Sequence, residues 1–169
     1  MKNTCITNGK PMYDVNGKRI NIQFPNIIYI NEKYYLYGSN KEFSKGPRQD
    51  GKNMIWHWGI KAYESDDLYN WKDVGLIIPP DENDPTSPFF PENTMDSPRI
   101  VYNKKTNKYV CWIVNMFEQA AYSYVSDSFT GPYIMVGKKI YPCGFRVGDL
   151  DVGIDLKDNA YLFFNNPHR

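Results

Sequence analysis

Short strand-like runs that come in pairs, each pair joined by a polar turn, constrain this chain more than any other feature of its sequence. The runs are rich in Ile, Val and Tyr, and the turns are rich in Asn, Asp, Lys and Gly. Two such runs around a short turn predict a β-hairpin. The first two pairs cover residues 26–30 with 34–38, and residues 59–65 with 69–75.

The same arrangement then repeats along the chain. A second set of two hairpins is predicted at 99–103 with 108–112 and at 121–127 with 133–137, and a third set opens at 149–155 with 160–164. Two hairpins supply the four strands of a propeller blade, and propellers typically close with about 4 to 8 blades. Residues 1–169 therefore predict one domain, an incomplete β-propeller arc of two and a half to three blades.

Composition supports an all-β chain. Phe, Trp and Tyr make up 16% of the residues, and 14 of these are tyrosines, which suit both strand-rich cores and sugar-binding clefts. No stretch keeps apolar residues at helical spacing for three turns. An open arc would leave strand edges uncovered, so we also expect self-association through sheet edges.

Charge and motifs exclude several classes of function. Twenty basic and 19 acidic residues give a net charge of +1, which favours neither nucleic acid nor a membrane surface as partner. The three cysteines are far apart, and no metal-ligand spacing or phosphate-binding glycine loop is present. We therefore expect no metal and no cofactor.

Two segments interrupt the repeat, and we expect both to be loops at the rim of a pocket. They cover residues 41–53 and the proline-rich residues 79–91, and strand patterning resumes directly after each. Trp58 lies beside the first insert, with Trp56 and His57. These rings fit stacking on carbohydrate and a buried strand edge equally well.

Two aspartates stand where the innermost strands of successive blades should begin. Aligning the repeats on Pro25, Pro98 and Leu150 gives Asp149 the same place as Phe24 and Ser97. Asp96 lies one residue before Ser97. Inner strands surround the propeller axis, and glycoside hydrolysis requires paired carboxyl groups across one bond. Taken alone, each aspartate fits a turn residue that caps a strand entry better than a catalytic group.

At this point the sequence resembles glycoside hydrolase family 43, most closely its exo-β-1,3-galactanase-like branch. The matching stretches include Lys33-Tyr34-Tyr35-Leu36-Tyr37-Gly38, the segment 59–72 with its Asp67-Leu68-Tyr69-Asn70-Trp71 run, and Pro98-Arg99-Ile100-Val101-Tyr102-Asn103. Residues 125–133 and 149–163 continue the match in order. The resemblance spans nearly the whole chain and implies the N-terminal portion of a five-bladed catalytic propeller.

The resemblance also implies roles for individual residues. Asp149 matches the aspartate that tunes the pKa of the general acid, and Asp96 matches an acidic position that contacts the sugar. The general acid itself would follow in the fourth blade, after Arg169. Phe24 stands where the family usually has its catalytic base, and Ser39 stands where this branch often has Glu. We expect Phe24, Ser39 and Trp58 to contact substrate.

These expectations combine into one functional hypothesis with two alternatives. The hypothesis is a glycoside hydrolase acting on a plant-type polysaccharide, with β-1,3-galactan as the candidate substrate, by acid-assisted displacement with water. The alternatives are a carbohydrate-binding propeller without catalysis and an inactive truncated fragment. No signal peptide is visible, although relatives of this kind are usually exported, so the compartment stays open.

Overall fold

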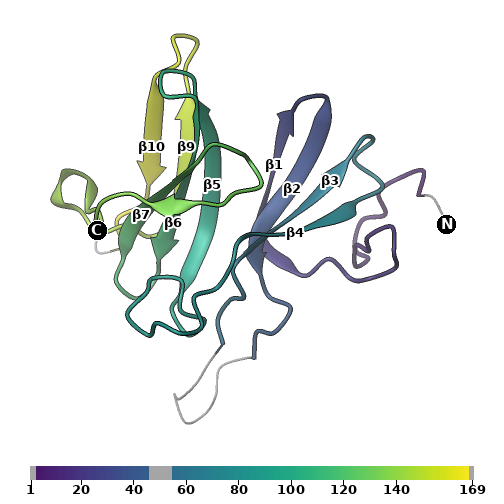
Figure 1. Cartoon of the computed structure of the whole chain (residues 1–169), viewed down its shortest axis with the longest axis horizontal. Helices are drawn as coiled ribbons and strands as arrows, with labels where there is room; N and C mark the ends of the chain where they lie inside the picture. Colours follow the sequence, from purple (N-terminus) through teal and green to yellow (C-terminus); the bar gives the residue numbers. More distant parts are fainter. Residues whose placement is uncertain (1–2, 46–54, 168–169) are drawn as a thin grey trace.

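The computed structural model describes residues 3–45 and 55–167, and its first half is a single four-stranded antiparallel sheet. The strands follow the order β1-β2-β3-β4, so each pairs with its neighbour in the sequence (Figure 1). Their bounds are β1 Ile22–Ile30, β2 Lys33–Asn40, β3 Ile60–Ser65 and β4 Lys72–Ile78. This sheet is the first blade.

A second sheet of the same topology follows, and then a hairpin. The second blade consists of β5 Met95–Asn103, β6 Lys108–Asn115, β7 Ala120–Ser126 and the two-residue β8 Ile134–Met135. A short 3-10 turn at Pro142–Gly144 leads to the third unit, which pairs β9 Leu150–Ile154 with β10 Ala160–Phe164.

The inner strands of the three units lie beside one another. Strand β1 contacts β5, and β5 contacts β9, so the sheets fan out around a common side (Figure 1). No α-helix occurs within residues 3–45 and 55–167. The prediction of an all-β propeller arc of two and a half to three blades is therefore confirmed. Each predicted hairpin is present, but β8 covers only two residues of the predicted strand 133–137.

One strand begins later than the sequence pattern predicts. We expected a strand from residue 69, but β4 begins at Lys72. The Asp67 carboxylate accepts hydrogen bonds from the backbone N–H groups of Tyr69 (2.9 Å) and Asn70 (2.8 Å). These bonds close a compact turn and keep residues 66–70 out of the sheet ladder.

Tyrosine side chains build much of the core between the first two blades. Tyr37 is 1% exposed, and its hydroxyl oxygen accepts a hydrogen bond of 2.9 Å from the backbone N–H of Ile100 in β5. Burial raises the pKa of Tyr37, so the hydroxyl stays neutral. Phe129 packs against Tyr35 and Tyr37, with ring centroids 4.7 and 5.8 Å away. Packing between the blades thus explains part of the high aromatic content.

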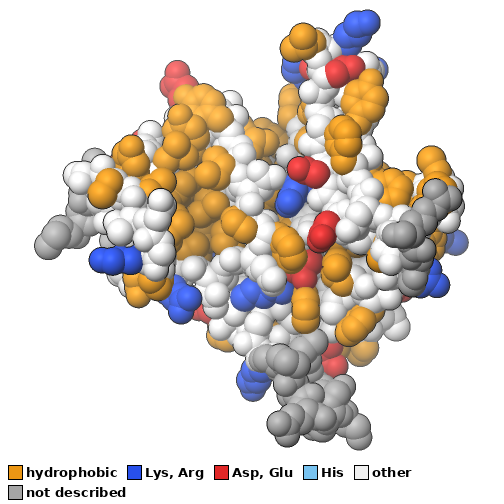
Figure 2. All heavy atoms as spheres, turned by 180° about the vertical axis from the view of Figure 1, so that it is seen from behind, with side chains coloured by type: hydrophobic (Ala, Val, Ile, Leu, Met, Phe, Trp, Pro, Cys, Tyr) orange, Lys and Arg blue, Asp and Glu red, His pale blue; other side chains and the backbone are white. Residues whose placement is uncertain are grey.

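The surface is not uniformly polar. Apolar side chains gather over the first blade, and the β9–β10 hairpin projects away from the body with apolar side chains along it (Figure 2). On β1, Ile27 is 50% exposed and Tyr29 is 59% exposed, and on β10 Phe163 is 61% exposed. Among the described residues, no helix is long and apolar enough to span a bilayer.

Candidate functional site

The first two inner strands carry the same irregularity at the predicted site positions. The register of β1 against β2 shifts between Gln23 and Asn26, and that of β5 against β6 shifts between Asp96 and Arg99. Each shift is a β-bulge whose first residue has a left-handed backbone, at Phe24 (φ 52°) and Ser97 (φ 53°). The two positions are therefore structurally equivalent, as the alignment on Pro25 and Pro98 predicts.

Glycine is required opposite the first bulge. A Cβ atom at Gly38, in the neighbouring strand β2, would lie 2.7 Å from the backbone oxygen of Gln23. That separation is too short for a carbon and an oxygen, so any side chain here would push the bulge out of place. Gly38 thus helps to fix the backbone that presents Phe24.

The third inner strand departs from this pattern. Strand β9 pairs with β10 without a register shift, and Asp149 lies directly before it with its backbone oxygen accepting from the N–H of Asn165 (3.2 Å). The Asp149 side chain is exposed, and Asp149 is not among the described residues with positive φ. Asp149 thus occupies the predicted strand entry, with a backbone different from that of Ser97.

Asp96 is a buried carboxylate with two donors. Asp96 is 1% exposed. The indole Nε1 of Trp56 donates to Oδ2 of Asp96 (2.5 Å), and the ammonium Nζ of Lys41 donates to Oδ1 (3.2 Å). Lys41 begins the first insert and Trp56 follows it, so the two hydrogen bonds connect this insert to the second blade. Lys41 and Trp56 occupy the carboxylate of Asp96, and its expected contact with the sugar stays a prediction.

Lys41 is held as firmly as its partner. Its ammonium also donates to the backbone oxygen of Trp56 (2.8 Å) and lies 4.6 Å from the centroid of the Trp56 ring. Burial lowers the pKa of Lys41, and the charge of Asp96 opposes that shift. The Lys41 side chain retains 14% exposure, so it is the charged group of this cluster that solvent can reach.

Ser39 and Trp58 lie near this cluster, but with different exposure. Ser39 is fully buried, and its hydroxyl donates to the backbone oxygen of Met95, the neighbour of Asp96 (3.3 Å). Trp58 is half-buried, and its ring meets that of Phe43 edge-on at 5.1 Å. Trp58 therefore has ring surface available for stacking, whereas the Ser39 side chain is buried and hydrogen-bonds the backbone of β5.

His57, between the two tryptophans, is part of the core. Its Nδ1 accepts a hydrogen bond from the backbone N–H of Gly59 (2.9 Å), and its ring meets Phe89 edge-on at 5.5 Å. Burial lowers the pKa of His57 to about 4, so the ring is neutral at physiological pH. Phe89 is 3% exposed and anchors the second insert, whereas residues 46–53 of the first insert lie outside the described residues.

The structure thus brings together some of the predicted site residues. Asp96, Ser39 and Trp58 surround the junction of the first two blades, together with Lys41 and Trp56. Within the described residues, no hydrogen bond or ion pair links the Asp149 side chain to them. Sequence reasoning missed Lys41, because a lysine 55 residues from its partner gives no spacing signal. Among the described residues, no group of three His, Cys, Asp or Glu side chains could hold a metal ion.

Comparison with known proteins finds chains of similar fold among solved structures. No protein-family model and no curated protein matches the sequence. Among solved structures, the chain is similar to an exo-β-1,3-galactanase from Phanerochaete chrysosporium in complex with galactose, with a TM-score of 0.82 and 20% identity. It is also similar to a GH43 β-1,3-galactosidase (TM-score 0.82, 24% identity) and to an exo-β-1,3-galactanase from Clostridium thermocellum (TM-score 0.76, 20% identity).

The chain has the fold of one part of these enzymes. The three matches cover 96%, 99% and 94% of this chain but only 36%, 34% and 35% of the respective enzymes, so the chain spans about a third of their length. The resemblance to family 43 propellers that the sequence suggests is therefore confirmed at the level of the fold.

Proposed function

We propose that this chain is part of a glycoside hydrolase that acts on polysaccharide, with β-1,3-galactan as its substrate. The observation that supports this proposal is the similarity to exo-β-1,3-galactanases and β-1,3-galactosidases over nearly all of the chain. The bulges at Phe24 and Ser97 add local support, because they present side chains at the start of two adjacent inner strands.

The proposed reaction cleaves one glycosidic bond with water. A carboxylic acid protonates the leaving oxygen while water attacks the anomeric carbon from the opposite face. In this proposal Asp149, exposed at the entry of β9, raises the pKa of that acid by its negative charge. The acid belongs to a later blade, so we infer that residues 1–169 alone do not turn over galactan.

Asp96 acts on the sugar indirectly in this proposal. Its carboxylate is buried and holds Lys41 and Trp56, which are the more accessible members of the cluster. An ammonium group and an indole face are both common partners of sugar rings. In this proposal Lys41, Trp56 and Trp58 contact the sugar, and Asp149 acts from the entry of β9.

A carbohydrate-binding propeller without catalysis is the second candidate. It is favoured by Phe24, which stands at the position of the usual family base, and by Lys41, which compensates the charge of Asp96. In this case the chain would bind the same sugar but supply no acid chemistry.

Binding and turnover can be tested separately on the purified chain. We expect β-1,3-galactotriose to release heat on titration into residues 1–169, and cellotriose to release none. We expect no galactose release from β-1,3-galactan above a mock preparation. Absence of galactotriose binding would contradict both candidate functions, and turnover by residues 1–169 would contradict the assignment of the acid to a later blade.

The product of the complete reading frame then decides between hydrolase and binding module. Turnover of galactan by this product, and its loss in Asp149→Asn with galactotriose binding retained, is the result expected for the hydrolase. Binding without any turnover would favour the binding module. The matched control is Asp151→Asn, which removes a neighbouring carboxylate paired with Arg99.

A further inference from the structure

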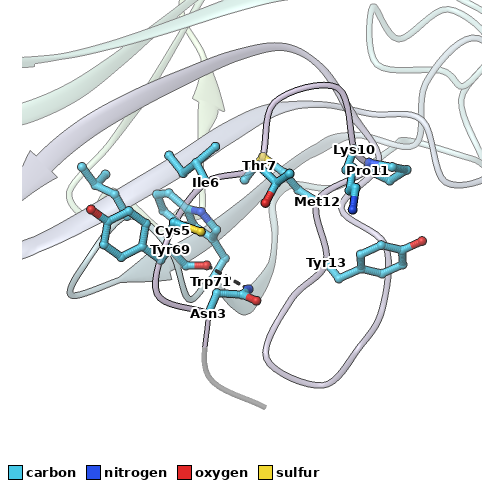
Figure 3. A pocket seen from close by; sticks show the side chains of 11 residues that line it. Asn3, Cys5, Ile6, Thr7, Lys10, Pro11, Met12, Tyr13, Tyr69 and Trp71 are labelled. Atoms are coloured by element: carbon cyan, nitrogen blue, oxygen red, sulfur yellow. Dashed lines mark hydrogen bonds between the residues drawn. The ribbon is translucent and has the colours of Figure 1, made fainter.

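The N-terminal segment encloses a cavity against the first blade that the proposed function does not use. We call residues 3–13 the N-terminal strap. It is held by reciprocal hydrogen bonds between Asn3 and Asn70, of 2.8 and 2.9 Å, and the chain just after it is held by the N–H of Val15 donating to the oxygen of Trp71 (2.8 Å). Between the strap and the β3–β4 turn lies a cavity of about 410 Å³ (Figure 3).

The size and walls of this cavity are those of a small-molecule site. Ligand pockets commonly measure about 300 to 1,000 Å³ and combine apolar walls with a few polar groups. Tyr69 and Trp71 lie at one side of the cavity, and Lys10 and Tyr13 lie at the other (Figure 3). Tyr13 is 48% exposed and Tyr69 is 40% exposed, so both rings offer faces for stacking.

The indole of Trp71 adds an independent observation. Trp71 is 2% exposed, and its Nε1 has no hydrogen-bond partner among the described residues. A buried donor without an acceptor costs free energy, and most buried indole N–H groups find a partner. The Nε1 atom exposes less than 1 Å² of surface, so the indole contributes to the wall of the cavity without offering this donor to an occupant.

The polar groups of the cavity are biased toward donors. Lys10 can only donate, while Thr7 and Asn3 can donate or accept. None of the described lining residues is acidic, and no carboxylate pairs with Lys10 within residues 3–45 and 55–167. A ligand with a negative charge therefore meets a free cation and no opposing charge.

We propose that this cavity binds a uronic acid, that is, a sugar ring carrying a carboxylate. The ring stacks on Tyr69 or Tyr13, and the carboxylate pairs with Lys10. The cavity lies at the strap and the β3–β4 turn, whereas the proposed hydrolytic site lies at the starts of the inner strands. The proposal therefore does not rest on the proposed galactan activity.

Calorimetric titration of the full chain with D-glucuronate, and with D-glucose as the neutral analogue, tests this proposal. Both sugars differ from the galactose units of the proposed substrate, so a failure here is distinct from a failure of the proposed function. We expect D-glucuronate to bind in the millimolar range or tighter and D-glucose to bind at least about tenfold more weakly, because a charged hydrogen bond contributes about 1.5–3 kcal/mol.

Substitutions locate the binding. Lys10→Met should weaken D-glucuronate binding about tenfold, while Lys105→Met, which removes an exposed lysine from the β5–β6 turn, should leave it unchanged. Tyr69→Ala should weaken binding of both sugars. No binding of D-glucuronate, equal binding of the two sugars, or an equal loss in both lysine variants would overturn the proposal. Circular dichroism of each variant confirms that it is folded.

Discussion

At the scale of single residues, the buried pair of Asp96 and Lys41 links the first two blades. Both groups are largely removed from water, and each compensates the charge of the other. Removing one charge from a buried pair is costly, because the remaining charge stays in a medium of low dielectric. The pair also joins residues from different blades, so it holds the blade junction as well as the site.

We expect Asp96→Asn to lower the free energy of unfolding by about 2–3 kcal/mol, since it leaves the partly buried Lys41 ammonium without a carboxylate. Urea unfolding followed by tryptophan fluorescence measures the effect. The matched variant Asp151→Asn, at a carboxylate that is 66% exposed, should change stability by less than about 1 kcal/mol. An equal loss in the free energy of unfolding for the two variants would contradict a special contribution of the buried pair to stability.

His57 gives the chain a pH-dependent stability. Its pKa is about 4 in the folded state and 6.5 for the free side chain, so the unfolded state binds more protons between these values. Stability should therefore fall as the pH is lowered from 6.5 to 4, by up to about 3 kcal/mol at 1.36 kcal/mol per pKa unit. We expect His57→Gln to flatten this part of the curve, measured by urea midpoints. An unchanged slope would mean that other groups carry the dependence.

At the scale of elements, the sequence predicted every hairpin, because alternating Tyr and Ile runs with Asn, Asp and Lys turns are local signals. The equivalence of the Pro25 and Pro98 positions was also visible as a repeat. Two features could not be predicted. The delayed start of β4 depends on which backbone groups Asp67 binds, and the pairing of Asp96 with Lys41 depends on contacts 55 residues apart.

The blades should differ in local stability. Strand β6 is paired on both sides, and Cys111 and Ile113 within it are fully buried, whereas β10 is paired only with β9 and exposes Phe163. Amide protons with few buried neighbours exchange through small local openings. We expect exchange in β10 to be at least about tenfold faster than in β6, measured by NMR or mass spectrometry. Uniform protection across both strands would indicate a single cooperative unit.

At the scale of the whole molecule, the arc presents apolar surface at both ends, over the first blade and along the third hairpin. Such edges favour pairing between copies. We therefore expect the purified chain to show a mass that rises with concentration in light scattering. Phe163→Lys, on β10, should reduce this association, whereas Phe117→Lys, at an exposed phenylalanine in the β6–β7 turn, should not. A constant monomer mass would contradict the expectation.

The left-handed backbone at Phe24 affects which side chains the start of β1 can carry. This backbone is fixed by Pro25 and by the pairing of Gln23 and Asn26 with β2 before and after the bulge. Aspartate adopts such a backbone more readily than phenylalanine does. A carboxylate at the start of this inner strand would thus fit the existing backbone, and a change at one codon could supply it.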